Sequence, residues 1–144
     1  MIFYDAGGIK SQFLKAVLDA KNIEYRTETV TSECAIGDKD LLLMEIFPAI
    51  KYLDERYPVP KLFAASPEQN ARLSLFVLDV MLKAYETGNY DSVFKEINDL
   101  PFPHNFLLGD NLTIADLVLY PILPDTPTWN RYKAKIEEQL NNEQ

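Results

Sequence analysis

The sequence predicts an α/β unit with the order β-α-β-β-β-α, followed by a unit made only of helices. Short apolar or alternating runs, which are typical of strands, lie in roughly the first sixty residues. Residues 57–66 then carry two prolines and no hydrophobic period, which marks a linker. After this linker, the periodic segments have the spacing of helices.

The first unit is expected to hold four strands and two helices. Ser11 is well placed as the N-cap of the first helix, because a serine hydroxyl can accept a hydrogen bond from a free amide of the first turn. A Gly/Asp turn at 37–40 predicts a tight hairpin. The strands are expected at 2–4, 24–31 and the two arms of a hairpin over 34–44, and the helices at 11–23 and Glu45–Arg56.

Capping boxes locate the main helices of the second unit. Ser66 starts a helix that is expected to end at Gly88. Thr113 and Asp116 start a helix over 114–123, in which the aspartate carboxylate would reach back to the N-cap amide. This segment is apolar almost all round, so it should form the buried centre of the unit. Further helices are expected at 90–99 and 128–140.

Composition excludes several classes of function. The net charge of −8 argues against binding to nucleic acid, which needs clustered lysine and arginine. No apolar run is long enough to cross a membrane and no secretory signal is visible, so a cytoplasmic protein is expected. The only cysteine, Cys34, and the only histidine, His104, are far apart, so no metal site is expected. His104 reads as a surface loop residue.

Three stretches resemble the glutathione transferase superfamily. Residues 49–58 look like the end of the third helix in these proteins, and 129–139 look like their closing helix. Residues 106–123 are the most specific, because Gly-Asp, the capping box and the apolar run occur in the family's order. The resemblance implies a truncated thioredoxin-like βαβββα domain lacking its second helix, a linker and a small helical C-terminal domain, at 1–57, 58–66 and 67–144.

Within the superfamily, two stretches are similar to stringent starvation protein A-like proteins, which bind RNA polymerase instead of processing glutathione. Residues 7–25 resemble their first helix, and 55–73 resemble their linker. In those proteins a Pro-x-Pro element contributes to the polymerase-binding surface. By this resemblance, the corresponding residues are Pro58, Val59 and Pro60.

Glutathione chemistry in this family needs a hydroxyl or thiol near the first helix, a cis-proline before the third strand and an acid–serine pair. Ser11 is the candidate for the hydroxyl and Tyr4 is the second choice, although both have ordinary structural readings as a helix cap and a packed aromatic. Cys34 stands at the proline position, and because a non-proline cis bond costs roughly 2.5–4 kcal/mol, its peptide should be trans. Glu45 is followed by isoleucine, so the serine is missing. Glutathione is therefore not expected to bind.

The sequence thus favours a non-catalytic protein that regulates transcription by binding RNA polymerase or a sigma or transcription factor. Two alternatives stay open. One is a small glutathione transferase that uses Ser11 or Tyr4, and the other is a structural or assembly protein. The family habit implies a symmetric homodimer. The expected partner surface consists of Tyr57, Pro58, Val59, Pro60, Lys61, Leu62 and Phe63.

Overall fold

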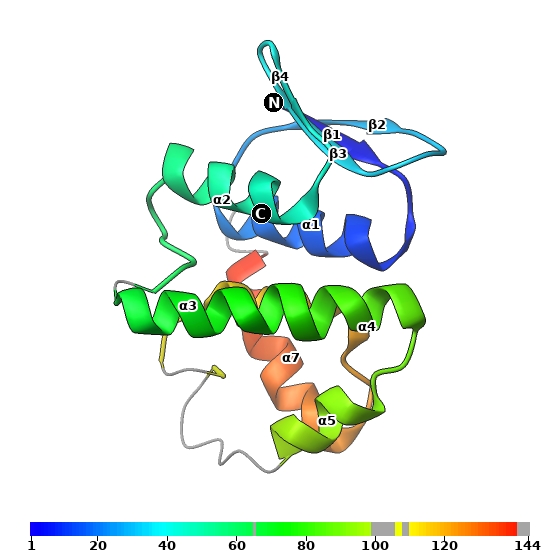
Figure 1. Cartoon of the computed structure of the whole chain (residues 1–144), viewed down its shortest axis with the longest axis vertical. Helices are drawn as coiled ribbons and strands as arrows, with labels where there is room; N and C mark the ends of the chain where they lie inside the picture. Colours follow the sequence, from blue (N-terminus) through cyan, green and yellow to red (C-terminus); the bar gives the residue numbers. More distant parts are fainter. Residues whose placement is uncertain (65, 99–105, 108–109, 141–144) are drawn as a thin grey trace. The chain divides into compact units, whose positions relative to one another are not determined.

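A computed structural model describes residues 1–64, 66–98, 106–107 and 110–140 (Figure 1). The chain divides into two compact units. The first comprises Met1–Lys61 together with Leu140, and the second comprises Leu62–Gln139. The division between Lys61 and Leu62 falls inside the linker predicted at 58–66.

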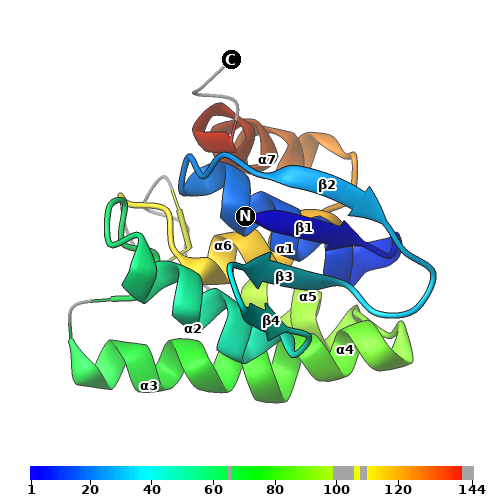
Figure 2. The same ribbon diagram turned by 90° about the horizontal axis from the view of Figure 1, so that it is seen from above.

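The first unit is built on one mixed sheet. Its strands lie in the order β2-β1-β3-β4, as Figure 2 shows. β1 runs parallel to β2 and antiparallel to β3, and β3 is antiparallel to β4. The strands are β1 (Ile2–Asp5), β2 (Arg26–Thr29), β3 (Ala35–Asp38) and β4 (Leu41–Leu43). The predicted order β-α-β-β-β-α is confirmed.

Two helices, α1 (Gly8–Ala20) and α2 (Ile46–Arg56), cover one face of this sheet (Figure 1). The core between them is apolar, and Phe3 and Ile36, which pair across β1 and β3, are both fully buried in it. On the other face, the ring of Tyr4 lies against Gly37, where an added Cβ would come within 3.2 Å of the ring. The described residues place no helix between β2 and β3.

One local prediction for the first unit is wrong. Ser11 does not cap α1, because the helix begins one turn earlier, at Gly8 after an N-cap at Gly7. Both glycines have φ near +80°, at 77° and 82°, a conformation that other residues rarely adopt. The predicted hairpin is confirmed, with its turn narrowed to 39–40: Gly37 belongs to β3, and Lys39 takes the left-handed conformation with φ of 57°.

One long helical segment opens the second unit. It consists of α3 (Pro67–Leu75), a π-helical segment η1 (Phe76–Met81) and α4 (Leu82–Thr87). The hydroxyl of Ser66 accepts a hydrogen bond from the Gln69 amide, and Gly88 ends the segment in the left-handed conformation, so both predicted ends are confirmed. The π-helical segment was not predicted.

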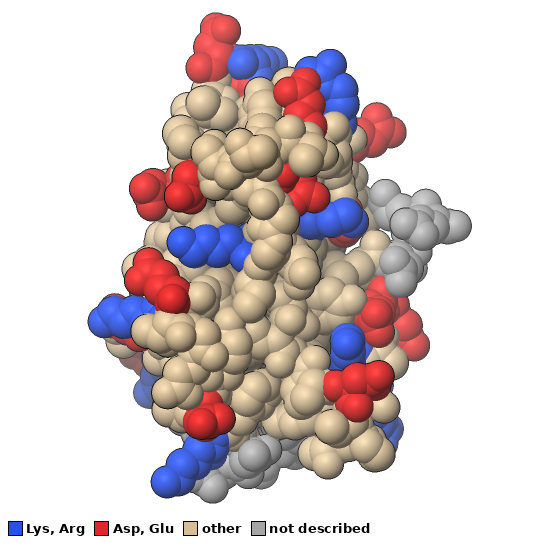
Figure 3. Space-filling model, turned by 90° about the vertical axis from the view of Figure 1, so that its right-hand side faces the viewer, with Lys and Arg blue, Asp and Glu red and all other residues tan. Residues whose placement is uncertain are grey.

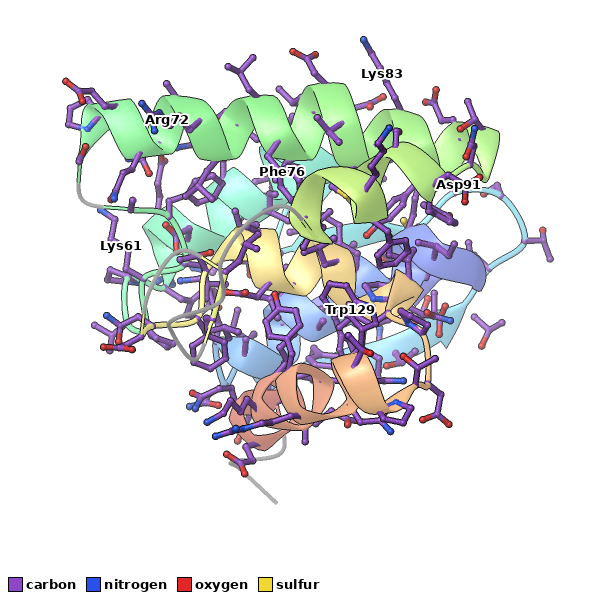
Figure 4. All side chains as sticks on the ribbon, turned by 90° about the horizontal axis from the view of Figure 1, so that it is seen from below. Lys61, Arg72, Phe76, Lys83, Asp91 and Trp129 are labelled. Carbon is purple, nitrogen blue, oxygen red and sulfur yellow. The ribbon has the colours of Figure 1, made fainter. Side chains whose placement is uncertain are left out.

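A short buried helix forms the centre of the second unit. α6 (Ile114–Leu119) is buried at every position, as its apolar sequence predicts. It is shorter than predicted because Pro121 cannot continue an α-helix, and the chain passes into the 3-10 turn η2 (Tyr120–Ile122). α5 (Asp91–Asn98) and α7 (Pro127–Leu140) complete the unit. Trp129 of α7 points towards α5, where its ring lies 5.6 Å from that of Phe94 (Figure 4).

The helices described in the structure include none that is long and apolar enough to cross a membrane.

Candidate functional site

The chain leaves α2 through an exposed, proline-containing segment. Pro58, Pro60 and Lys61 are exposed, and Val59 is 82% exposed, which is the highest value among the exposed large hydrophobic residues of the described ranges. A side chain this open contributes nothing to the core, so the segment lies at the surface of its unit. We call Tyr57–Lys61 the proline loop.

The predicted partner surface is wrong at its C-terminal end. Leu62 and Phe63 are only 1% and 4% exposed, so they belong to the core and not to the surface. The Leu62 carbonyl accepts a 2.9 Å hydrogen bond from the Ile114 amide at the start of α6. The sequence did not separate these two apolar residues from the loop before them, because burial depends on contacts that form only on folding.

A buried lysine holds the proline loop from inside. Lys21, which directly follows α1, has a side chain that is 0% exposed. Its ammonium group donates hydrogen bonds to the carbonyls of Tyr57 and Pro60, the second at 2.8 Å. It also forms an ion pair with Asp54 of α2, with 2.8 Å between Nζ and Oδ1. An ammonium group has three protons, so these contacts satisfy it completely.

Sequence reasoning missed this lysine. A lysine at the C-terminal end of a helix is ordinary, because it complements the helix dipole and usually lies in water. Nothing in the local pattern indicates that Lys21 is buried. One signal was available: Asp54 lies on the buried side of the amphipathic helix α2, and a buried carboxylate needs a cation as its partner.

Two cations flank the loop. The guanidinium carbon of Arg56 lies 5.2 Å above the ring centre of Tyr57, within the range of a cation–π contact. Lys61 is exposed at the other end. The face in Figure 3 carries acidic and basic side chains mixed together. The loop thus has an exposed cation at each end, and the exposed carboxylate of Glu55 precedes Arg56.

Two of the residues considered for glutathione chemistry lie together. Ser11 and Cys34 are 3% and 5% exposed, and the hydroxyl of Ser11 accepts a 3.1 Å hydrogen bond from the Ala6 amide. Burial raises the pKa of the Cys34 thiol, and the hydrogen bond with Ser11 only partly opposes this effect. The environment of this buried thiol therefore opposes formation of the nucleophilic thiolate.

Of the other two glutathione candidates, Tyr4 pairs across the sheet with Ala35, the residue after Cys34. Tyr4 lies against Gly37, whereas the neighbouring β1 residue Phe3 points into the core beneath the helices. Glu45 is the exposed N-cap of α2, and its side chain makes no capping hydrogen bond. The peptide before Cys34 is trans, as predicted, since Val59–Pro60 is the one cis bond among the described residues. The structure thus places Ser11 beside Cys34, with Tyr4 on the neighbouring strand.

The remaining polar candidates do not form a site. No group of metal-binding side chains occurs in the ranges that the structure describes, and His104 lies outside them. Asp116 is fully buried and has the predicted capping role, because it accepts hydrogen bonds from the amides of Thr113 and Leu107, both at 2.9 Å.

No family model matches the chain, and no curated protein matches it in sequence. Solved structures do match. Maleyl pyruvate isomerase, a bacterial zeta-class glutathione transferase in its holo form, aligns with a TM-score of 0.73 and 16% identity over 96% of both chains. A glutathione transferase homologue from Burkholderia with bound glutathione aligns with a TM-score of 0.72 and 17% sequence identity. The alignment covers 98% of this chain and 94% of that one. A delta-class glutathione transferase from Nilaparvata lugens aligns with a TM-score of 0.71 and 14% sequence identity. That alignment covers 99% of this chain and 93% of the other. The chain therefore has the glutathione transferase fold.

Proposed function

We propose that this chain is a non-catalytic protein of the glutathione transferase fold that regulates transcription by binding RNA polymerase or a sigma or transcription factor. The observation that carries the proposal is the proline loop, which is exposed at Pro58, Val59 and Pro60 and anchored from within by Lys21. The resemblance of residues 55–73 to stringent starvation protein A-like proteins supports this choice of partner.

The loop has the physical properties of a recognition element. Its prolines fix two backbone angles, and the hydrogen bonds from Lys21 hold the carbonyls at both ends. A loop that is ordered before binding loses little conformational entropy when it docks. Val59 supplies an apolar contact, while Arg56 and Lys61 favour a partner surface with carboxylates around an apolar hollow.

The proposal includes the absence of glutathione chemistry. A transferase needs an accessible hydroxyl or thiol that stabilises the glutathione thiolate, but Ser11 and Cys34 are buried. The raised pKa of Cys34 also opposes formation of a cysteine thiolate. The Burkholderia neighbour holds glutathione, and we propose that this chain does not.

The test is recovery of RNA polymerase on the immobilised protein. Replacing Pro58 and Pro60 with alanine should lower recovery by about tenfold, because the loop loses its fixed backbone angles and populates its docking conformation less often. Pro127→Ala is the matched control, because Pro127 is also exposed but lies at the first position of α7, where alanine is well accepted.

Circular dichroism should show that all the variants are folded. Unchanged polymerase recovery by the folded loop variant would contradict the proposal. If the loop instead retains a protein unrelated to transcription, the chain is an assembly protein and the transcriptional part of the proposal is wrong.

A further inference from the structure

The ion pair between Lys21 and Asp54 is buried in the interior of the first unit. Their side chains are 0% and 7% exposed. Removing two charges from water is costly, and apolar residues of similar volume often stabilise a fold at least as well. Stability alone therefore does not explain why a lysine occupies this position. The remaining bonds of the lysine indicate another role, because its two carbonyl partners, Tyr57 and Pro60, both belong to the proline loop.

We propose that Lys21 is a positioning residue that fixes the proline loop in its binding conformation, with Asp54 as its counter-charge. This inference rests on the proposed binding role of the loop. The partner would contact Pro58, Val59 and Pro60, and Lys21 would act only through the backbone beneath them.

The loop needs such a donor because it has few of its own. Prolines carry no backbone N–H group, so Pro58 and Pro60 cannot donate to a neighbouring carbonyl. The ammonium group of Lys21 supplies the missing donors to Tyr57 and Pro60. Both bonded carbonyls are directed towards the buried lysine, and the side chain between them, Val59, is 82% exposed.

Asp54 links this arrangement to α2. Its carboxylate lies 2.8 Å from Lys21 Nζ and balances the buried charge. The amide of Tyr57 bonds to the carbonyl of Leu53 at 2.9 Å, so the loop begins as a direct continuation of the helix. The position of α2 thus determines where the loop starts, and Lys21 determines how it turns.

The chain contains a natural comparison within α1, the helix that Lys21 follows. Lys15 and Asp19 also form an ion pair at 2.8 Å, but their side chains are 54% and 25% exposed. This pair joins two residues one turn apart in α1 and has no described bond to the loop. A change to it should therefore leave the loop as it is.

The experiment compares two double variants of the full chain. Lys21→Met with Asp54→Leu removes both charges together, so no unpaired charge is left in the interior and the fold should survive. Lys15→Met with Asp19→Asn is the control, in which asparagine keeps an acceptor for the hydroxyl of Tyr25. Circular dichroism and thermal unfolding establish that both variants are folded.

Trypsin reports the order of the loop directly. Cleavage after Arg56 and Lys61 measures local opening, and cleavage after Lys83 in α4 measures general loosening. Figure 4 shows that Lys61 and Lys83 both point outward from the chain. In the Lys21/Asp54 variant, cleavage at the two loop sites should rise and cleavage after Lys83 should stay constant. Polymerase recovery should fall by about tenfold, as expected if the competent loop conformation drops to about a tenth of the population.

The outcomes separate the two proposals. Faster loop cleavage with lost recovery supports both. Faster loop cleavage with unchanged recovery would show that Lys21 orders the loop but that the loop does not bind, which overturns the proposed function. Loop cleavage that is unchanged, or that rises only in step with cleavage after Lys83, overturns the positioning role of Lys21 whatever the recovery.

Discussion

Cys34 shows how the environment of one residue decides its chemistry. As the only cysteine of the chain, it could be a reactive thiol or a space-filling residue. The structure supports the second reading, because the side chain is 5% exposed and burial raises the pKa of its thiol. A thiol that stays protonated and covered by the core reacts slowly with electrophiles.

We expect an aromatic disulfide reagent to label native Cys34 at least about tenfold more slowly than the unfolded chain, because the thiol must first be exposed by local opening. Absorbance of the released thiol measures the rate, with and without urea. Cys34→Ser is the blank, since it removes the only thiol. Rapid labelling of the folded protein would show that Cys34 is accessible and would reopen the enzymatic reading.

Lys21 is a second residue whose role depends on its environment. A lysine directly after a helix is usually exposed, yet the side chain of Lys21 has no exposure and its charge is satisfied by three acceptors from α2 and the loop. The side chain is identical in both readings. Only the approach of Asp54 and the two loop carbonyls distinguishes a surface lysine from an internal one.

The capping box of α6 shows how one side chain connects several elements. Asp116 accepts hydrogen bonds from two backbone amides and from the hydroxyls of Thr113 and Tyr132. It therefore joins the start of α6 to the segment before it and to α7. The sequence predicted the bond within the box but not the bonds from Leu107 and Tyr132, which come from outside it.

Asp116→Ala should destabilise the protein by about 3 kcal/mol or more, because several buried donors lose their acceptor at once. Tyr132→Phe should cost only about 1 kcal/mol, because it removes one hydrogen bond and leaves the amide bonds of Asp116 intact. Urea unfolding measures both. Equal losses in the two variants would contradict this role of Asp116.

The same residue should produce a pH dependence of stability. Burial raises the pKa of Asp116 above its ordinary value of 3.8. Between 3.8 and the raised value, the folded chain keeps the proton while the unfolded chain releases it, so the free energy of unfolding falls as the pH rises through this window. The asparagine variant of Asp116 cannot titrate and should lack this contribution. A difference between wild type and variant that is constant with pH would contradict it.

Helix ends were predicted well where a side chain or a glycine marks them. Ser66, Thr113 and Gly88 act as expected because their capping bonds and angles are local. The start of α1 was misplaced because a serine and a pair of glycines competed for the same role, and Ser11 instead accepts a hydrogen bond from Ala6. The π-helical segment η1 carries no glycine or proline signal that distinguishes it from an α-helix.

At the scale of the whole molecule, the fold is shared with glutathione transferases although the identity to these neighbours is only 14–17%. A pattern of apolar positions is enough to specify such a fold, whereas a binding site depends on individual residues. In this chain two of the four candidates, Ser11 and Cys34, are buried.

The protein should therefore pass through immobilised glutathione without retention. Cys34→Pro alone should not restore binding, because the serine after Glu45 and the helix between β2 and β3 would still be missing. A glutathione transferase with known retention on the same resin is the positive control. Specific elution of the wild-type protein by free glutathione would overturn the non-catalytic proposal.

The sequence by itself determined the order of strands and helices and the position of the break between the units, because hydrophobic periods, caps and prolines act over a few residues. It also located the exposed prolines of the loop. The tertiary structure decided which apolar residues beside them are buried, the pairing of Ser11 with Cys34, and the role of Lys21. These depend on contacts between segments far apart in the chain, and no local pattern records whether a distant acceptor will approach a given side chain.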